Sequence, residues 1–134
     1  MKADPPGRFW PAVGDDVWDR IRSEFGLPSL EDVTSRFQAS SDQPLPPLVR
    51  VFIGEGTFCP GFQFQDGEPV PAVLRLFDAA LELKVPHNVF AAWMVTPVRA
   101  PGTIRPVDVL DRSPDLEREL AAFADRHRPL PAKR

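Results

Sequence analysis

Proline sets the strictest limit on how this chain can fold. The sequence has 17 prolines in 134 residues, more than twice the usual share of about 5%. Proline has no backbone N–H and disrupts both helix interiors and central strands, so each regular element has to fit between prolines. Most of these prolines lie between segments with periodic apolar residues. We therefore expect short elements that are joined by rigid connections.

Two amphipathic helices are predicted in the N-terminal third. The first covers residues 15–25, with apolar positions at Val17, Trp18, Ile21 and Phe25 and a glycine stop at Gly26. This spacing is typical of a helix with one buried face. The second starts after Ser29 in the pattern of a capping box and buries Leu30, Val33 and Phe37. The prolines after residue 43 end it.

A short β-hairpin is predicted next. The β-branched run at 48–53 indicates a strand, residues 54–57 a turn, and residues 58–64 a returning strand. Alternation along that second strand places Phe62 on the buried face and turns Gln63 the other way.

The rest of the chain is predicted to be helical. A helix from about residue 70 to the residue before Pro86 buries Val73, Leu74, Phe77 and Leu81. A short helix at 88–95, a helical turn that ends at Leu110 and a final helix from Ser113 follow.

These elements indicate a predominantly helical α+β fold. It comprises two N-terminal helices, a short β-hairpin and a C-terminal unit of three to four helices. We divide the chain into an irregular arm (1–13), a helical hairpin (14–47), a main domain (48–126) and a basic tail (127–134).

Charge and composition point to a cytoplasmic protein without a membrane span. The formal net charge is −3, and one cysteine, Cys59, excludes an intramolecular disulfide. The chain has no apolar run of about 18 residues, and its first residues lack the apolar region of a signal peptide. The acidic balance argues against non-specific binding to nucleic acid.

No catalytic, cofactor or metal site is predicted, so we expect a protein that is not an enzyme. Cys59 and His87 could form a thiolate pair, but a cysteine beside apolar residues is more often packed in a core. The glycines at 54 and 56 lack the lysine of a phosphate loop and indicate a hairpin turn instead. His87 and His127 lie 40 residues apart, without metal-ligand spacing.

DNA binding by residues 14–38 is an alternative. Two helices joined by a short turn match the outline of a helix-turn-helix. A helix that reads DNA should present basic or amide side chains, whereas the second helix begins with Glu31 and Asp32. Simple packing of the two helices is therefore favoured.

Four motifs in residues 58–126 resemble the toxin-binding domain of the Xre/MbcA/ParS antitoxin family. The matching residues are Pro60, Phe62 and Gln63; Val73 and Leu74; Trp93, Met94 and Pro97; and Gly102, Arg105, Pro106, Val109 and Leu110. The resemblance covers about half of the chain and depends on the order of the motifs.

The resemblance implies a bacterial antitoxin that neutralises a RES-domain toxin, an NAD-consuming enzyme, by covering its active site. It implies a complex with that toxin, with homo- or hetero-oligomers possible. Our candidate partner-binding residues are Phe62, Gln63, Trp93, Arg105, Arg126, Arg128, Lys133 and Arg134. Trp93 and Phe90 suit either a core or an interface. A transcriptional regulator and a non-catalytic structural module are the alternatives.

Overall fold

The computed structural model describes residue 10 and residues 13–40, 46–97 and 104–127. Its helices are α1 (Asp15–Glu24), α2 (Leu30–Ser40), α3 (Pro71–Glu82), α4 (His87–Met94) and α5 (Ser113–His127). Its 3-10 turns are η1 (Gly61–Gln63), η2 (Pro106–Asp108) and η3 (Leu110–Arg112). Its strands are β1 (Val51–Ile53), β2 (Gly56–Phe58), β3 (Phe64–Gln65) and β4 (Glu68–Pro69). The predominantly helical α+β fold is confirmed.

Local sequence explains where the helices begin and end. α1 is followed by Gly26, whose φ of 88° is a left-handed conformation that glycine adopts without strain. The hydroxyl of Ser29 accepts the N–H of Asp32 at 3.1 Å, as the capping-box pattern predicts. Pro71 occupies the first turn of α3, where its missing N–H leaves no helical bond unmade.

The strands form two small antiparallel hairpins. Val51 pairs with Phe58 and Ile53 with Gly56, so Gly54 and Glu55 make the turn between β1 and β2. β3 and β4 pair across residues 66–67. The predicted second strand, 58–64, is shorter than expected because the chain enters η1 directly after Pro60, a residue that cannot donate to a strand ladder.

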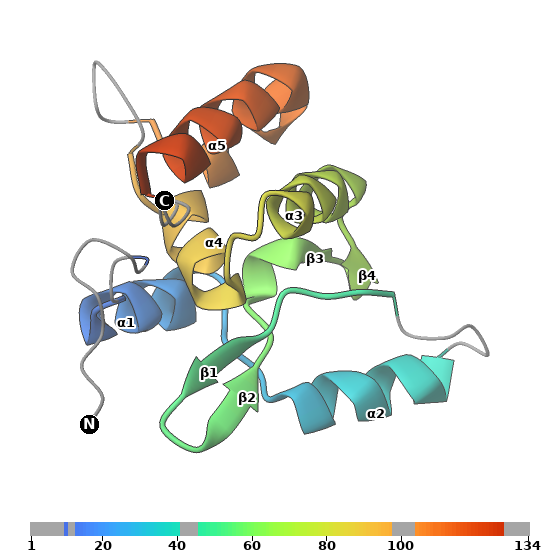
Figure 1. Ribbon diagram of the computed structural model, residues 1–134. Coiled ribbons are helices and arrows are strands. Elements are labelled where there is room, and N and C mark those ends of the chain that lie inside the picture. Colours follow the sequence, from blue (N-terminus) through green and yellow to red (C-terminus); the bar gives the residue numbers. More distant parts are fainter. Residues whose placement is uncertain (1–9, 11–12, 41–45, 98–103, 128–134) are drawn as a thin grey trace.

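The main cluster is the larger of the two hydrophobic clusters that the described residues form. It contains side chains of α1, α3, α4 and α5, and Figure 1 shows α3 beside α5, with α4 between this pair and α1. At its centre, Phe77 and Phe90 are fully buried, with ring centroids 5.5 Å apart. Burial of such large aromatic side chains supplies much of the stabilising hydrophobic free energy.

The face that α3 buries differs from the predicted one. Leu81 was expected in the core but is 41% exposed, whereas Leu76 and Ala80 are fully buried. Val73 and Phe77 belong to both possible stripes, so periodicity alone cannot choose between them. Packing of α5 on α3 selects the side with Leu76, while Leu74 turns toward a different cluster.

The α2 cluster is the smaller of the two. Val33, Leu48 and Cys59 are its buried members, and Leu30, Phe64 and Leu74 pack against it. It attaches α2 to the extended segment before β1 and to the end of β2. Figure 1 shows α2 at the lower right and α1 at the left, and the two N-terminal helices pack on different clusters.

Side chains, rather than a third strand, close the outer edge of β1. Asn88 accepts the N–H of Phe52 at 2.9 Å and donates to its C=O at 3.0 Å. His87 Nδ1 accepts the N–H of Arg50 at 2.9 Å. The first turn of α4 therefore satisfies backbone groups that a neighbouring strand would otherwise bind.

No helix in the described ranges is both long and apolar enough to span a bilayer.

Candidate functional site

A cavity of about 310 Å³ opens between α1, α4 and α5, and we call it the α1–α4–α5 groove. Its lining residues are Val13, Gly14, Val17, Val89, Ala92, Trp93, Thr96, Pro97, Glu119, Phe123 and Arg126. Most of them are apolar, and they lie in or directly beside three helices that are far apart in the sequence.

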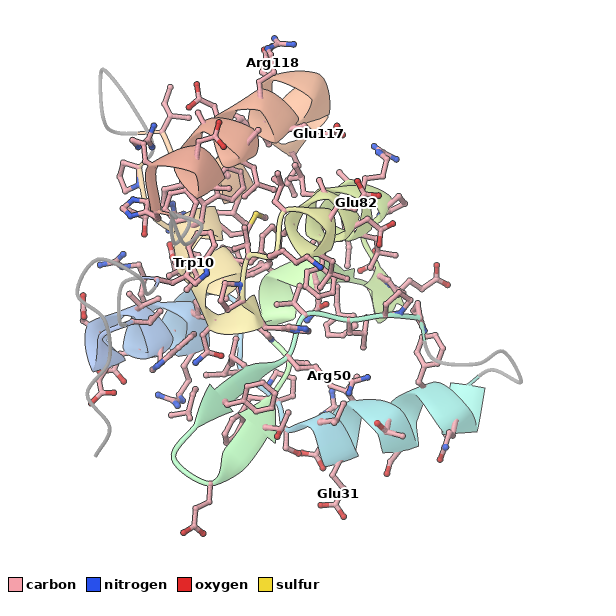
Figure 2. All side chains as sticks on the ribbon, in the orientation of Figure 1. Trp10, Glu31, Arg50, Glu82, Glu117 and Arg118 are labelled. Atoms are coloured by element: carbon pink, nitrogen blue, oxygen red, sulfur yellow. The ribbon has the colours of Figure 1, made fainter. Side chains whose placement is uncertain are left out.

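Aromatic side chains form one wall of the groove. The Trp93 and Phe123 rings lie 6.5 Å apart, and the Trp10 ring lies 6.2 Å from that of Phe123. Figure 2 shows Trp10 between α1 and α5. Ala92 also lines the groove, and its small side chain leaves space that a larger residue at this position would fill.

Few polar groups face the groove. Thr96 Oγ1 donates to the C=O of Ala92, 2.6 Å away, one turn earlier in α4. Glu119 already interacts with another group of the chain. Arg126 is exposed at the rim, and within the described part of the chain it makes no ion pair. Its charge is therefore the one most available to an incoming group.

A second, wider cavity of about 820 Å³ lies between α2 and the turn of β3 and β4. Apolar residues such as Phe37 and Phe64 line it together with Asp32, Asp66 and Arg36. The two acids and the arginine give this cavity no dominant charge, so its lining does not indicate one kind of ligand.

The structure separates the candidate partner-binding residues. Phe62 and Trp93 are buried, and Trp93, at 4% exposure, belongs to the main cluster while one side lines the groove. Phe90 is fully buried in the core, whereas Trp93 belongs to the core and also lines the groove. Arg126 lies at the rim of the groove. The candidates Arg128, Lys133 and Arg134 fall outside the described residues.

Gln63 is fully buried, so the expectation that it points away from the core is wrong. It belongs to a 3-10 turn, where the two-residue alternation of a strand does not apply. Its side chain accepts the N–H of Val49 at 2.8 Å and donates to the C=O groups of Val49 and Pro60. Gln63 therefore satisfies buried backbone groups that would otherwise lack partners.

Arg105 connects the turn at η2 to the end of α1. It makes two hydrogen bonds to Asp108, at 2.8 and 3.0 Å, and a third to Glu24 at 2.6 Å. The hydrogen bonds from Arg105 hold the pKa of the Asp108 carboxyl below its usual value. Because its N–H groups bind Asp108 and Glu24, the role of Arg105 in this structure is to link η2 to α1.

The possible catalytic residues have other roles in the structure. Cys59 is buried in the α2 cluster, and burial raises the pKa of its thiol, so the thiolate is disfavoured. His87 Nδ1 is occupied by the N–H of Arg50, and its ring packs on Phe77 at 4.8 Å. No group of three or more His, Cys, Asp or Glu side chains with metal-binding geometry occurs among the residues that the structure places.

The groove was not predicted from the sequence. Val17 is predicted on the buried face of the first helix, and Ala92 has no predicted role. Two alanines, Ala91 and Ala92, lie between the large Phe90 and Trp93, but only the approach of α1 and α5 makes the space beside Ala92 a cavity.

Comparison with known proteins adds no relative. No family model matches the chain, and neither the curated proteins nor the solved structures contain a significant match.

Proposed function

We propose that the chain is an antitoxin-like protein that binds and neutralises a RES-domain, NAD-consuming toxin by covering its active site. The observation that carries this proposal is the placement of the residues that resemble the antitoxin family. Phe62, Val73, Trp93 and Met94 come from three of the four motifs, yet all are buried in the main cluster. Such convergence is expected of residues that specify one fold, and less so of unrelated matches along a sequence.

Other residues of the motifs also have structural roles that support the proposal. Gln63 fixes the backbone before β1, while Arg105 and buried Pro106 fix the turn before α5. The four motifs thus serve successive parts of the same unit.

Binding rather than catalysis is the mode of action that we propose. The thiol of Cys59 is held protonated by burial, and the imidazole of His87 is occupied by backbone and ring contacts. By contrast, the α1–α4–α5 groove is lined by Trp93, Phe123 and Arg126. Tryptophan and arginine are among the residue types that contribute most to the binding energy of protein interfaces.

Co-expression with a RES-domain toxin tests the proposal. The chain should restore growth, preserve the cellular NAD pool and elute with the toxin as one complex in size-exclusion chromatography. A second chain that ends at His127 measures the contribution of Arg128, Lys133 and Arg134. If the full chain gives neither a complex nor restored growth, the proposed function is wrong.

A further inference from the structure

The size of the α1–α4–α5 groove limits what can occupy it. Pockets for small molecules and cofactors span roughly 300–1,000 Å³, and this groove, at about 310 Å³, lies at the lower limit. A nucleotide or another large cofactor would find too little enclosed space. One large apolar side chain, with part of its backbone, is a better match.

The chemistry of the lining points in the same direction. A polar small molecule needs several hydrogen-bonding groups to fix its orientation. Here the hydroxyl of Thr96 donates to the C=O of Ala92, and Glu119 interacts within the chain. An apolar group, in contrast, would find the aromatic wall of Trp93 and Phe123.

The positive charge of Arg126 at the rim determines which kind of residue can lie next to that apolar side chain. Arg126 is exposed, lines the groove and has no ion-pair partner in the described ranges. A guanidinium group binds a carboxylate with paired hydrogen bonds, so an acidic residue beside the apolar anchor would be favoured and a basic one repelled.

We propose that the α1–α4–α5 groove binds a partner polypeptide through one large apolar side chain, next to an acidic residue that pairs with Arg126. This inference deepens the proposed function and rests on it, since the polypeptide would be a surface segment of the toxin. In this arrangement the apolar side chain of the partner contacts Trp93 and Phe123, and the carboxylate of its acidic residue lies at the last turn of α5.

A peptide titration of the ¹⁵N-labelled full chain tests the groove without the toxin. The probe is a capped peptide, Glu-Phe-Glu, and the controls are Lys-Phe-Lys and Glu-Ala-Glu. The chain contains three tryptophans, Trp10, Trp18 and Trp93. Glu-Phe-Glu should shift the indole signal of Trp93 saturably, with a dissociation constant on the order of 1 mM. Buried Trp18, which does not line the groove, should shift less.

Three variants assign the binding to the groove. Ala92→Leu fills the cavity and should abolish the shift of Trp93. Arg126→Glu should weaken binding of Glu-Phe-Glu by about tenfold, equivalent to about 1.4 kcal/mol, and strengthen binding of Lys-Phe-Lys. Arg75→Glu makes the same charge change on the exposed surface of α3, away from the groove, and should leave binding unchanged. The NMR spectrum of each variant verifies that it is folded.

Several results would overturn the inference. They are equal binding of the three peptides, binding that survives Ala92→Leu, and the absence of any saturable shift of Trp93. Self-association of the chain would also overturn the inference if the Phe52→Ser variant no longer self-associates. In that case the occupant of the groove would be the exposed Phe52 of a second copy of the chain.

The toxin experiment separates failure of the inference from failure of the proposed function. If the wild-type chain rescues growth and Ala92→Leu rescues equally well, the groove is not the contact and the function stands. If the peptides bind as expected but the chain forms no complex with the toxin, the groove stands and the proposed toxin is wrong.

Discussion

The main cluster and the α2 cluster differ in the number of buried side chains and in the number of elements that contribute them. Among the described residues, the main cluster has 19 buried members from helices, strands and connecting turns, whereas the α2 cluster has three. Loss of one side chain in the first leaves a cavity that many elements share. Loss of one in the second weakens the attachment of a single helix. The comparison suggests that α2 can detach while the rest stays folded, a local opening of low free energy.

The largest effect is expected from Phe77→Ala. Phe77 is almost completely buried and contacts Phe90 and His87, so its loss should lower the free energy of unfolding by about 3–5 kcal/mol. Chemical denaturation measures the change, and α2 and the remaining helices should unfold together at the lower midpoint. Leu81→Ala, on an exposed position of the same helix, is the control and should change stability little.

Gln63→Leu should cost about 2–4 kcal/mol, because it leaves the buried N–H and C=O of Val49 without partners. Gln63 holds a segment that contributes Val49 to the main cluster and Leu48 to the α2 cluster, so both should lose protection from amide hydrogen exchange. Gln65→Leu, at an exposed position, should not reproduce this loss. Equal stability of the two variants would contradict the role given to Gln63.

Val33→Ala tests the comparison itself. It removes apolar volume from the α2 cluster and should cost about 1–2 kcal/mol. Amides in α2 should then exchange faster, while those in α3 and α4 keep their protection. Val73→Ala makes the same substitution in the main cluster and should accelerate exchange throughout. If Val33→Ala also accelerated exchange throughout, the clusters would form one cooperative unit.

The smallest effect is expected from mild acid. Burial, and secondarily the charge of Arg50, lower the pKa of His87 in the folded chain below its ordinary value of 6.5. The unfolded chain therefore binds a proton at this residue more readily, so its contribution to stability is present above pH 6.5 and is lost as the pH falls below it. Thermal unfolding at a series of pH values measures this slope. His87→Gln should reduce the slope, and an unchanged slope would assign it to other groups.

Helices were predictable from the sequence because their signals are local. The stop at Gly26, the cap at Ser29 and the proline at position 71 act within one turn of the chain. The orientation of α3 was not predictable, since Leu76 and Leu81 suit a helical stripe equally well until α5 packs on one of them.

The candidate site was less predictable for the same reason. Gln63 was assigned by strand alternation, and only the 3-10 turn after Pro60 brings its amide to Val49. Arg105 looked like a surface contact, yet its partner Glu24 lies 81 residues away in the sequence. The groove itself exists only where three elements meet, so no single stretch of sequence contains it.

The closed edge of β1 has a consequence for the newly synthesised chain. Asn88, which covers the backbone of Phe52, is 30 residues beyond Phe58, the end of the hairpin. At a synthesis rate of roughly 5–20 residues per second, the hairpin leaves the ribosome seconds before its cover. During that interval its open edge is available to a neighbouring nascent chain. Asn88→Ala would extend this exposure to the finished protein, and its yield of soluble chain should fall even where the fold survives.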